Sequence, residues 1–70
     1  MNLQEVKDEV KRIKSISNDD EMAHAAEDDL RERFLKYVIS CPNYVTKAEL
    51  KELAVEVMKT SKIKFGRWTA

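Results

Sequence analysis

"DDEMAHAAEDDLRERFLKYVIS", residues 19–40, is the longest uninterrupted helical pattern in the chain and decides its fold. Its apolar residues recur at steps of three and four, which places them on one face of an α-helix. They are Met22, Ala26, Leu30, Phe34, Tyr37 and Val38, with Ala23 and Leu35 at the margins. We therefore predict a helix over residues 19–40 that forms the centre of the core.

Two further amphipathic segments flank this central helix. The first predicts a helix at about residues 2–15, with the apolar stripe Leu3, Val6, Val10 and Ile13. The second follows Pro42, which disfavours helical geometry at the residue before it. It predicts a helix at about residues 47–60, with the stripe Leu50, Leu53, Ala54, Val57 and Met58.

Short polar residues mark where the second and third helices begin. Asn18 or Ser17 is the expected N-cap of the second helix, because such side chains accept a hydrogen bond from the first turn and each is followed three residues later by an acid. Thr46 and Glu49 have the spacing of a capping box, which predicts the start of the third helix.

The last ten residues, 61–70, have a different pattern. Ile and Phe alternate with lysines over residues 62–65, which is the spacing of an extended chain, and Trp68 is the only tryptophan. Burying such a side chain stabilises a fold by roughly 1.5–3 kcal/mol. We therefore predict one all-α domain over residues 1–70, a small three-helix domain whose extended C-terminal tail packs on the second helix.

Size and composition limit the classes of function. Seventy residues bury only about 60% of the surface of the unfolded chain, which leaves little room for a deep catalytic cavity. Thirteen bases balance thirteen acids, whereas general nucleic-acid binding needs a basic footprint. The chain lacks a signal-peptide pattern and a membrane-length apolar run, and its single cysteine, Cys41, suits a reducing cytosol. We expect a complete cytoplasmic protein that is not an enzyme, needs no cofactor and does not enter a membrane.

The charges are unevenly distributed along the chain. Residues 19–29 hold six acids and the only histidine, His24, without a base. The simplest interpretation is that the early acids cap the helix and the later ones pair with Arg31 and Arg33. A second, compatible interpretation is that the basic end of the chain docks on this acidic helix. The bases at that end are Lys59, Lys62, Lys64 and Arg67.

The docking interpretation makes a specific prediction for the last residues. Arg67 would form a bidentate pair with Glu27 or Asp28, since a guanidinium matches the geometry of a carboxylate. The Trp68 ring would then cover the helix where small side chains leave room, near Ala23 and Ala26, close to His24.

Two other kinds of site remain open as alternatives. Glu21, His24 and Asp28 share a helical face and are weak candidates for a metal site, and hence for a metal-dependent hydrolase, because one helix offers few convergent ligands. A nucleic-acid-binding regulator would use Lys59, Lys62, Lys64 and Arg67. Nucleic acid is the less favoured partner, because the third helix carries as many acids as bases.

The acidic helix and the chain end together resemble small proteins encoded by tailed bacteriophages and prophages. The shared pattern is D-x-E-x-A-H-x-x-E-D-x-L followed near the C-terminus by I-x-F-x-R-W, and it covers about residues 19–39 and 61–70. The matching positions are Asp19, Glu21, Ala23, His24, Glu27, Asp28, Leu30, Ile63, Phe65, Arg67 and Trp68. The resemblance implies a phage gene and a bacterial cytoplasm, and it implies no chemistry.

From these observations we expect a non-enzymatic accessory protein that acts by binding another protein. Another protein is the expected partner, with the bacterial host as one source of it, and a homodimer is an open alternative. The candidate surface for interaction, or for docking within the chain, consists of His24, Glu27, Asp28, Arg67 and Trp68. No residue is assigned a catalytic role.

Overall fold

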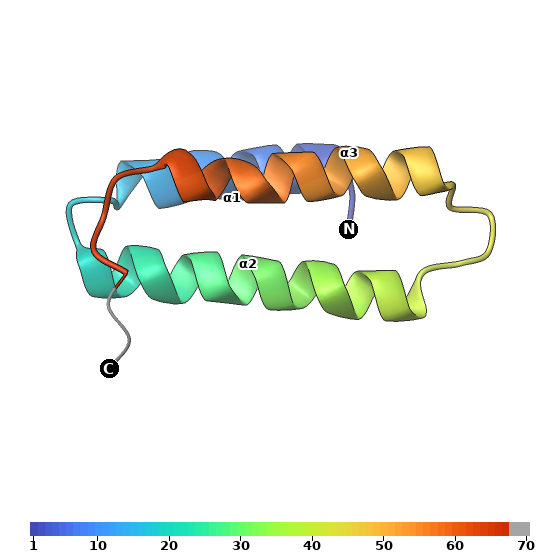
Figure 1. Cartoon of the computed structure of the whole chain (residues 1–70), viewed down its shortest axis with the longest axis horizontal. Coiled ribbons are helices and arrows are strands. Elements are labelled where there is room, and N and C mark those ends of the chain that lie inside the picture. Colours follow the sequence, from blue (N-terminus) through green and yellow to red (C-terminus); the bar gives the residue numbers. More distant parts are fainter. Residues whose placement is uncertain (68–70) are drawn as a thin grey trace.

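The computed structural model describes residues 1–67 as three α-helices and a short 3-10 helix. Their bounds are α1 Leu3–Ser15, α2 Asp20–Ser40, α3 Lys47–Met58 and η1 Lys59–Lys62. Figure 1 shows α1 and α3 lying together along one side of α2, with consecutive helices antiparallel. No strand forms within residues 1–67, so the predicted all-α class is confirmed.

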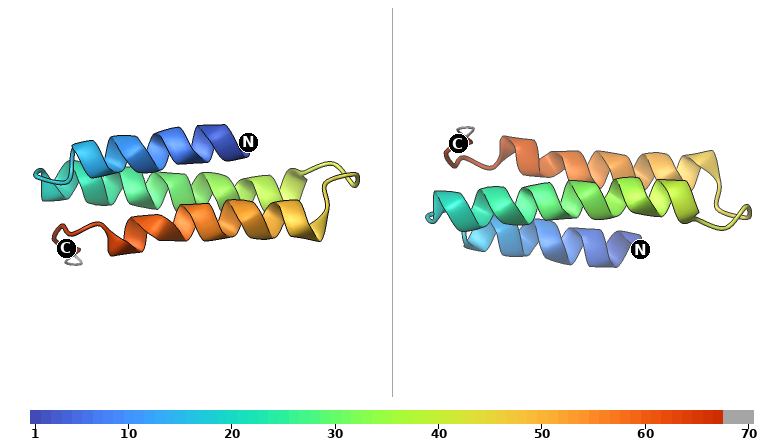
Figure 2. Two further views of the ribbon diagram at one scale, coloured as in Figure 1. Left: turned by 90° about the horizontal axis from the view of Figure 1, so that it is seen from above. Right: turned by 90° about the horizontal axis from the view of Figure 1, so that it is seen from below.

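The helices differ in length, and this difference shapes the molecule. α2 has 21 residues, whereas α1 has 13 and α3 has 12. Figure 2 shows that α1 begins short of the loop end of the α2–α3 pair, which therefore projects as two helices beyond it. The resulting body is elongated, with principal extents of 39 × 22 × 14 Å. Among the described residues, no helix combines the length and the apolar character that crossing a membrane requires.

The buried apolar core lies where all three helices overlap. Its members are Val6, Ile13, Ala23, Ala26, Leu30, Leu53 and Val57. No residue between Leu30 and Leu53 along the chain is buried, because α1 does not reach the loop end of the other two helices. The hydrophobic stabilisation of the fold is thus concentrated at the end that holds the α1–α2 turn.

The second helix starts one residue later than predicted and has a different cap. Asp19, rather than Asn18 or Ser17, is the N-cap, and its Oδ1 accepts a hydrogen bond from the Met22 N–H at 3.1 Å. The reason is the preceding turn, in which Asp19 N–H donates to the Ile16 carbonyl at 3.0 Å and so holds residues 17 and 18 outside the helix. The predicted cap of α3 is confirmed.

That cap is Thr46, whose Oγ1 accepts a hydrogen bond from the Glu49 N–H at 3.1 Å. The end of the third helix differs from the expectation. The α-helix stops at Met58 rather than at residue 60, and the chain tightens into η1 before becoming extended at Ile63. The tail over residues 61–70 is therefore extended only from Ile63 onward within the described part of the chain.

Three residues assigned to the apolar stripes are exposed instead of buried: Met22, Val38 and Met58. Conversely, Ala23, placed at the margin of the stripe, is fully buried. The reason is the rotation of α2 about its own axis. The side of α2 that faces the core is centred on Ala23 and Leu30, so Met22 faces the solvent. Val38 lies in the last turn of α2, at the end that α1 does not reach, and Met58 is the last residue of α3.

The position of the core predicts how side chains of similar type contribute to stability. Leu30→Ala should lower the free energy of unfolding by about 2–5 kcal/mol, because it opens a cavity in a close-packed site. Leu35→Ala, on the exposed side of the same helix, should change it by less than about 0.5 kcal/mol. Urea unfolding followed by circular dichroism measures both.

If Leu30→Ala does not fold, Ile13→Val provides the milder comparison, with an expected loss of about 0.5–1.5 kcal/mol. Equal effects of the Leu30 and Leu35 substitutions would contradict the placement of the core.

Candidate functional site

A carboxylate buried in the core organises the main polar cluster of this protein. Glu27 lies on the core face of α2, four residues after the buried Ala23 and three before the buried Leu30. Its side chain is only 1% exposed. A carboxylate in such a position is costly unless cations and hydrogen-bond donors surround it, so the neighbours of Glu27 have to provide both.

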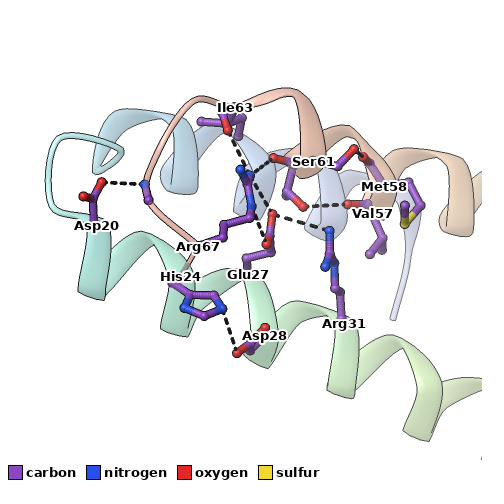
Figure 3. Close-up of polar contacts among 12 residues, drawn as sticks. Asp20, His24, Glu27, Asp28, Arg31, Val57, Met58, Ser61, Ile63 and Arg67 are labelled. Carbon is purple, nitrogen blue, oxygen red and sulfur yellow. Dashed lines mark hydrogen bonds and ion pairs between the residues drawn. The ribbon is translucent and has the colours of Figure 1, made fainter. Parts of the chain in front are cut away.

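Arg67 supplies most of that compensation (Figure 3). Its Nε donates to Glu27 Oε1 at 3.0 Å and its Nη2 to Glu27 Oε2 at 3.1 Å, which forms a bidentate pair. Nη2 also donates to the carbonyls of Thr60 at 2.7 Å and Ile63 at 2.9 Å. The Arg67 Cζ lies 3.8 Å from the centroid of the Phe65 ring, so the guanidinium is also held against an aromatic face.

A second arginine approaches the same carboxylate but is less well satisfied. Arg31 Nη2 lies 3.5 Å from Glu27 Oε2. Within the described part of the chain, the buried Arg31 Nε has no hydrogen-bond partner. Two guanidiniums therefore share one carboxylate, and the cluster has an excess positive charge on the side of Arg31.

The segment between η1 and Arg67 is attached at more than one point. Gly66 N–H donates to Asp20 Oδ1 at 2.8 Å, next to the start of α2. Ile63 and Phe65 pack against the core, while Lys64 is exposed. Trp68 lies outside the described residues, so its predicted place near His24, Ala23 and Ala26 stays a prediction.

Two of the remaining candidates on the acidic helix contact each other. His24 Nε2 lies 3.4 Å from Asp28 Oδ2, one turn along the exposed side of α2. Glu21 is exposed, and Glu21, His24 and Asp28 do not form the metal site considered from the sequence. Across residues 1–67, no three His, Cys, Asp or Glu side chains converge in a way that could hold a metal ion.

The basic candidates are also divided among different contacts. Lys59 Nζ lies 2.9 Å from Glu56 Oε1, and Arg67 is paired with Glu27. Lys62 and Lys64 are exposed. Two of the four bases proposed for nucleic-acid contact therefore already have an acid beside them, which reduces the positive field that the set presents.

The surroundings of Glu27 shift its proton affinity. Burial raises the pKa of its carboxyl group, but hydrogen bonding from Arg67 and Thr60 and the charges of Arg31 and Arg67 outweigh this, so the pKa is lowered from the ordinary value of 4.5. The Thr60 hydroxyl donates its one hydrogen to the Val57 carbonyl at 3.1 Å, so we regard Arg67 as the principal cause. The hydrogen bond to Glu27 in turn raises the pKa of Arg67.

Sequence reasoning named Glu27 and Arg67, and its expectation that the later acids pair with Arg31 and Arg33 is confirmed by the Arg31–Glu27 contact at 3.5 Å and the Arg33–Asp29 contact at 2.9 Å. It missed that Glu27 is buried and that Thr60 belongs to its cluster. The available signal was the position of Glu27 between Ala23 and Leu30, since an acid inside an apolar stripe needs a cation.

No protein-family model, curated protein or solved structure matches this chain significantly. Its function is therefore inferred from its own geometry.

Removing the cation should expose the cost of the buried carboxylate. Arg67→Ala should lower the free energy of unfolding by about 2–3 kcal/mol. This loss is smaller than for a fully buried ion pair, because the Arg67 side chain is partly exposed and Arg31 remains close to Glu27. Urea unfolding measures this loss. Lys36→Ala is the control, because it removes an exposed pair with Glu32 and should cost less than about 0.5 kcal/mol.

The double variant Glu27→Leu/Arg67→Met should recover most of the stability lost in Arg67→Ala, because it removes the buried charge together with its partner. A double variant less stable than Arg67→Ala would contradict the assignment of the loss to an uncompensated carboxylate.

The lowered pKa of Glu27 predicts how stability depends on pH. Because the pKa is lower in the folded state, the contribution is fully present above about pH 4.5 and is lost as the pH falls through the folded value. Glu27→Gln should be less stable than the wild type near neutral pH, and the difference should shrink below about pH 4.5. Urea midpoints measured for both proteins across this range test it, and a difference that grows on acidification would contradict it.

Proposed function

We propose that this chain is a non-enzymatic accessory protein of phage or prophage type that acts in the bacterial cytoplasm by binding another protein. The observation that carries the proposal is the set of large apolar side chains that α2, α3 and their connection leave exposed. These residues are Leu35, Val38, Ile39, Tyr44, Val55 and Met58. We call them the exposed apolar set. Exposed large apolar side chains are a feature of sites that bind other proteins.

The lengths of the helices explain why the members at the end of α2 and in its connection to α3 are exposed. α1 is too short to cover the loop end of α2 and α3, and the chain has no buried residue between Leu30 and Leu53. The charged residues nearby include an exposed pair, Glu32 and Lys36, which keeps this region polar at its edges. An apolar surface with a polar rim is the common anatomy of a protein interface.

The proposal gives the acidic helix and the chain end a structural role. The whole tail over residues 61–70 would pack on α2, with the Glu27–Arg67 pair as its anchor. Because those two side chains satisfy each other, they are poor contacts for a partner. This moves the proposed binding surface from the set His24, Glu27, Asp28, Arg67 and Trp68 to the exposed apolar set.

Affinity capture from a bacterial lysate tests the proposed surface with a matched pair of variants. Met58 and Met22 are both 55% exposed, but only Met58 belongs to the exposed apolar set. Met58→Gln should reduce the amount of captured partner by about tenfold or more, since an apolar anchor of this size contributes roughly 1.5–3 kcal/mol when it is buried. Met22→Gln should leave capture unchanged.

Circular dichroism controls for the folding of both variants. Equal capture by the wild type, Met58→Gln and Leu35→Gln would contradict the proposed surface. Loss of capture in Trp68→Ala, with capture retained in Met58→Gln, would return the binding surface to the end of the chain.

A further inference from the structure

A groove with a distinct chemical character lies between α2 and α3. It has a volume of about 310 Å³, and its lining is apolar except for one arginine. The lining residues are Arg31, Phe34 and Leu35 from α2, and Ala54, Val57 and Met58 from α3. Leu35 is 60% exposed and Met58 is 55% exposed, so each wall presents a large apolar side chain to solvent. We call this surface the Arg31 groove.

We propose that the Arg31 groove binds an amphipathic α-helix of another protein, and that a carboxylate on this helix pairs with Arg31. The inference rests on the proposed function and specifies the chemistry of its partner. It uses only part of the exposed apolar set, since only Leu35 and Met58 of that set line the groove.

The shape of the groove favours a helix as the occupant. Its walls are two antiparallel helices, and no α1 residue contributes to its lining. A helix laid along such a groove inserts side chains at positions i, i+3, i+4 and i+7 between the two walls. The added helix would pack beside α2 and α3 as the fourth member of a helical bundle, at the usual interaxial distance of about 8–10 Å.

The balance of charge favours a carboxylate on that helix. Glu27 already accepts two hydrogen bonds from Arg67, and Arg31 reaches it only at 3.5 Å. The other acids near Arg31 on α2 are engaged elsewhere. Asp28 lies 3.4 Å from His24, and Glu32 lies 3.2 Å from Lys36.

Arg31 is therefore the excess cation of the cluster, and its Nε has no hydrogen-bond partner among the described residues. A carboxylate from the occupant would supply an acceptor for a guanidinium that the chain's own acids do not satisfy. Apolar anchors alone would cover the Arg31 guanidinium while it has only the long contact to Glu27, which weakens binding.

A second copy of this chain is a poorer occupant of the groove. The lining contains a cation and no acid, so pairing groove with groove would leave both Arg31 side chains without a carboxylate. Pairing the groove with the acidic start of α2 on another copy would be a heterologous contact, which adds copies without closing into a dimer. These arguments favour a different protein that presents both apolar side chains and an acid.

The inference can be tested without knowing the natural partner. A displayed library of 18-residue helical peptides, with leucine at positions i, i+3, i+4 and i+7 and the flanking positions randomised, is selected against the immobilised wild-type chain. We expect enrichment of Asp or Glu at one flanking position. Selection against Arg31→Glu should instead enrich Lys or Arg at that position.

Peptides from the wild-type selection are then measured by fluorescence anisotropy against purified variants. Binding should weaken by about tenfold in Arg31→Gln and in Leu35→Gln, which remove the cation and one apolar wall. Met22→Gln is the matched control, because Met22 is an exposed apolar residue of the same helix outside both the groove and the exposed apolar set, and it should not change binding. Circular dichroism confirms that each variant is folded.

Several outcomes would overturn the inference. The first is a selection that shows no preference for an acidic residue, or selected peptides that bind Leu35→Gln and the wild type with equal affinity. The second is a wild-type dimer in sedimentation that Leu35→Gln dissociates, which would identify a second copy as the occupant. The third is tighter peptide binding by Trp68→Ala, which would identify the chain's own end as the occupant.

Failure of this inference is distinguishable from failure of the proposed function. If lysate capture depends on Met58 but the peptide selection shows no acidic preference, the protein-binding function stands and the inferred partner chemistry is wrong. If capture is independent of the exposed apolar set while acidic peptides still bind the groove, the inferred chemistry stands and the proposed function is wrong.

Discussion

The buried carboxylate of Glu27 determines which side chains must surround it in the core. An ionised acid inside an apolar core requires a cation at short range, and the chain supplies it 40 residues later as Arg67. The same guanidinium donates to the carbonyls of Thr60 and Ile63, so one side chain connects α2 to the end of η1 and to the extended segment after it. A single ionic requirement thus sets the path of the chain after the third helix.

This arrangement divides the molecule into two chemically different ends. Where α1, α2 and the segment before Arg67 meet, the side chains of the core are buried and the main polar groups are paired within the chain. At the opposite end, α2 and α3 continue without α1, and large apolar side chains such as Ile39 and Tyr44 are exposed. Stability and recognition can therefore be carried largely by different residues, so a substitution of an exposed groove residue such as Leu35 need not disturb the core.

Apolar periodicity was sufficient to locate the three helices, because each helix is long enough for its stripe to repeat several times. Apolar periodicity was insufficient to determine the rotation of a helix about its own axis, which decides whether a residue faces the core or the solvent. Met22 and Ala23 are neighbours in the sequence, yet a rotation of about 100° places one in solvent and the other in the core. The same limit kept Glu27 and Asp28 equivalent as partners for Arg67, although only Glu27 faces the core. Choosing between them requires knowing which face of α2 the other helices cover.

The position of Glu27 between two arginines connects the anchored end of the described chain physically to the Arg31 groove. While Arg67 occupies both carboxylate oxygens, Arg31 is held only by a longer contact and keeps an Nε without an acceptor among the described residues. If Arg67 were removed, Arg31 would be the nearest remaining cation for Glu27, and it would be drawn towards the core. The cation of the groove is therefore available to a partner because the segment ending at Arg67 is in place. An acid on a bound helix would complete the pairing, giving two carboxylates for two guanidiniums.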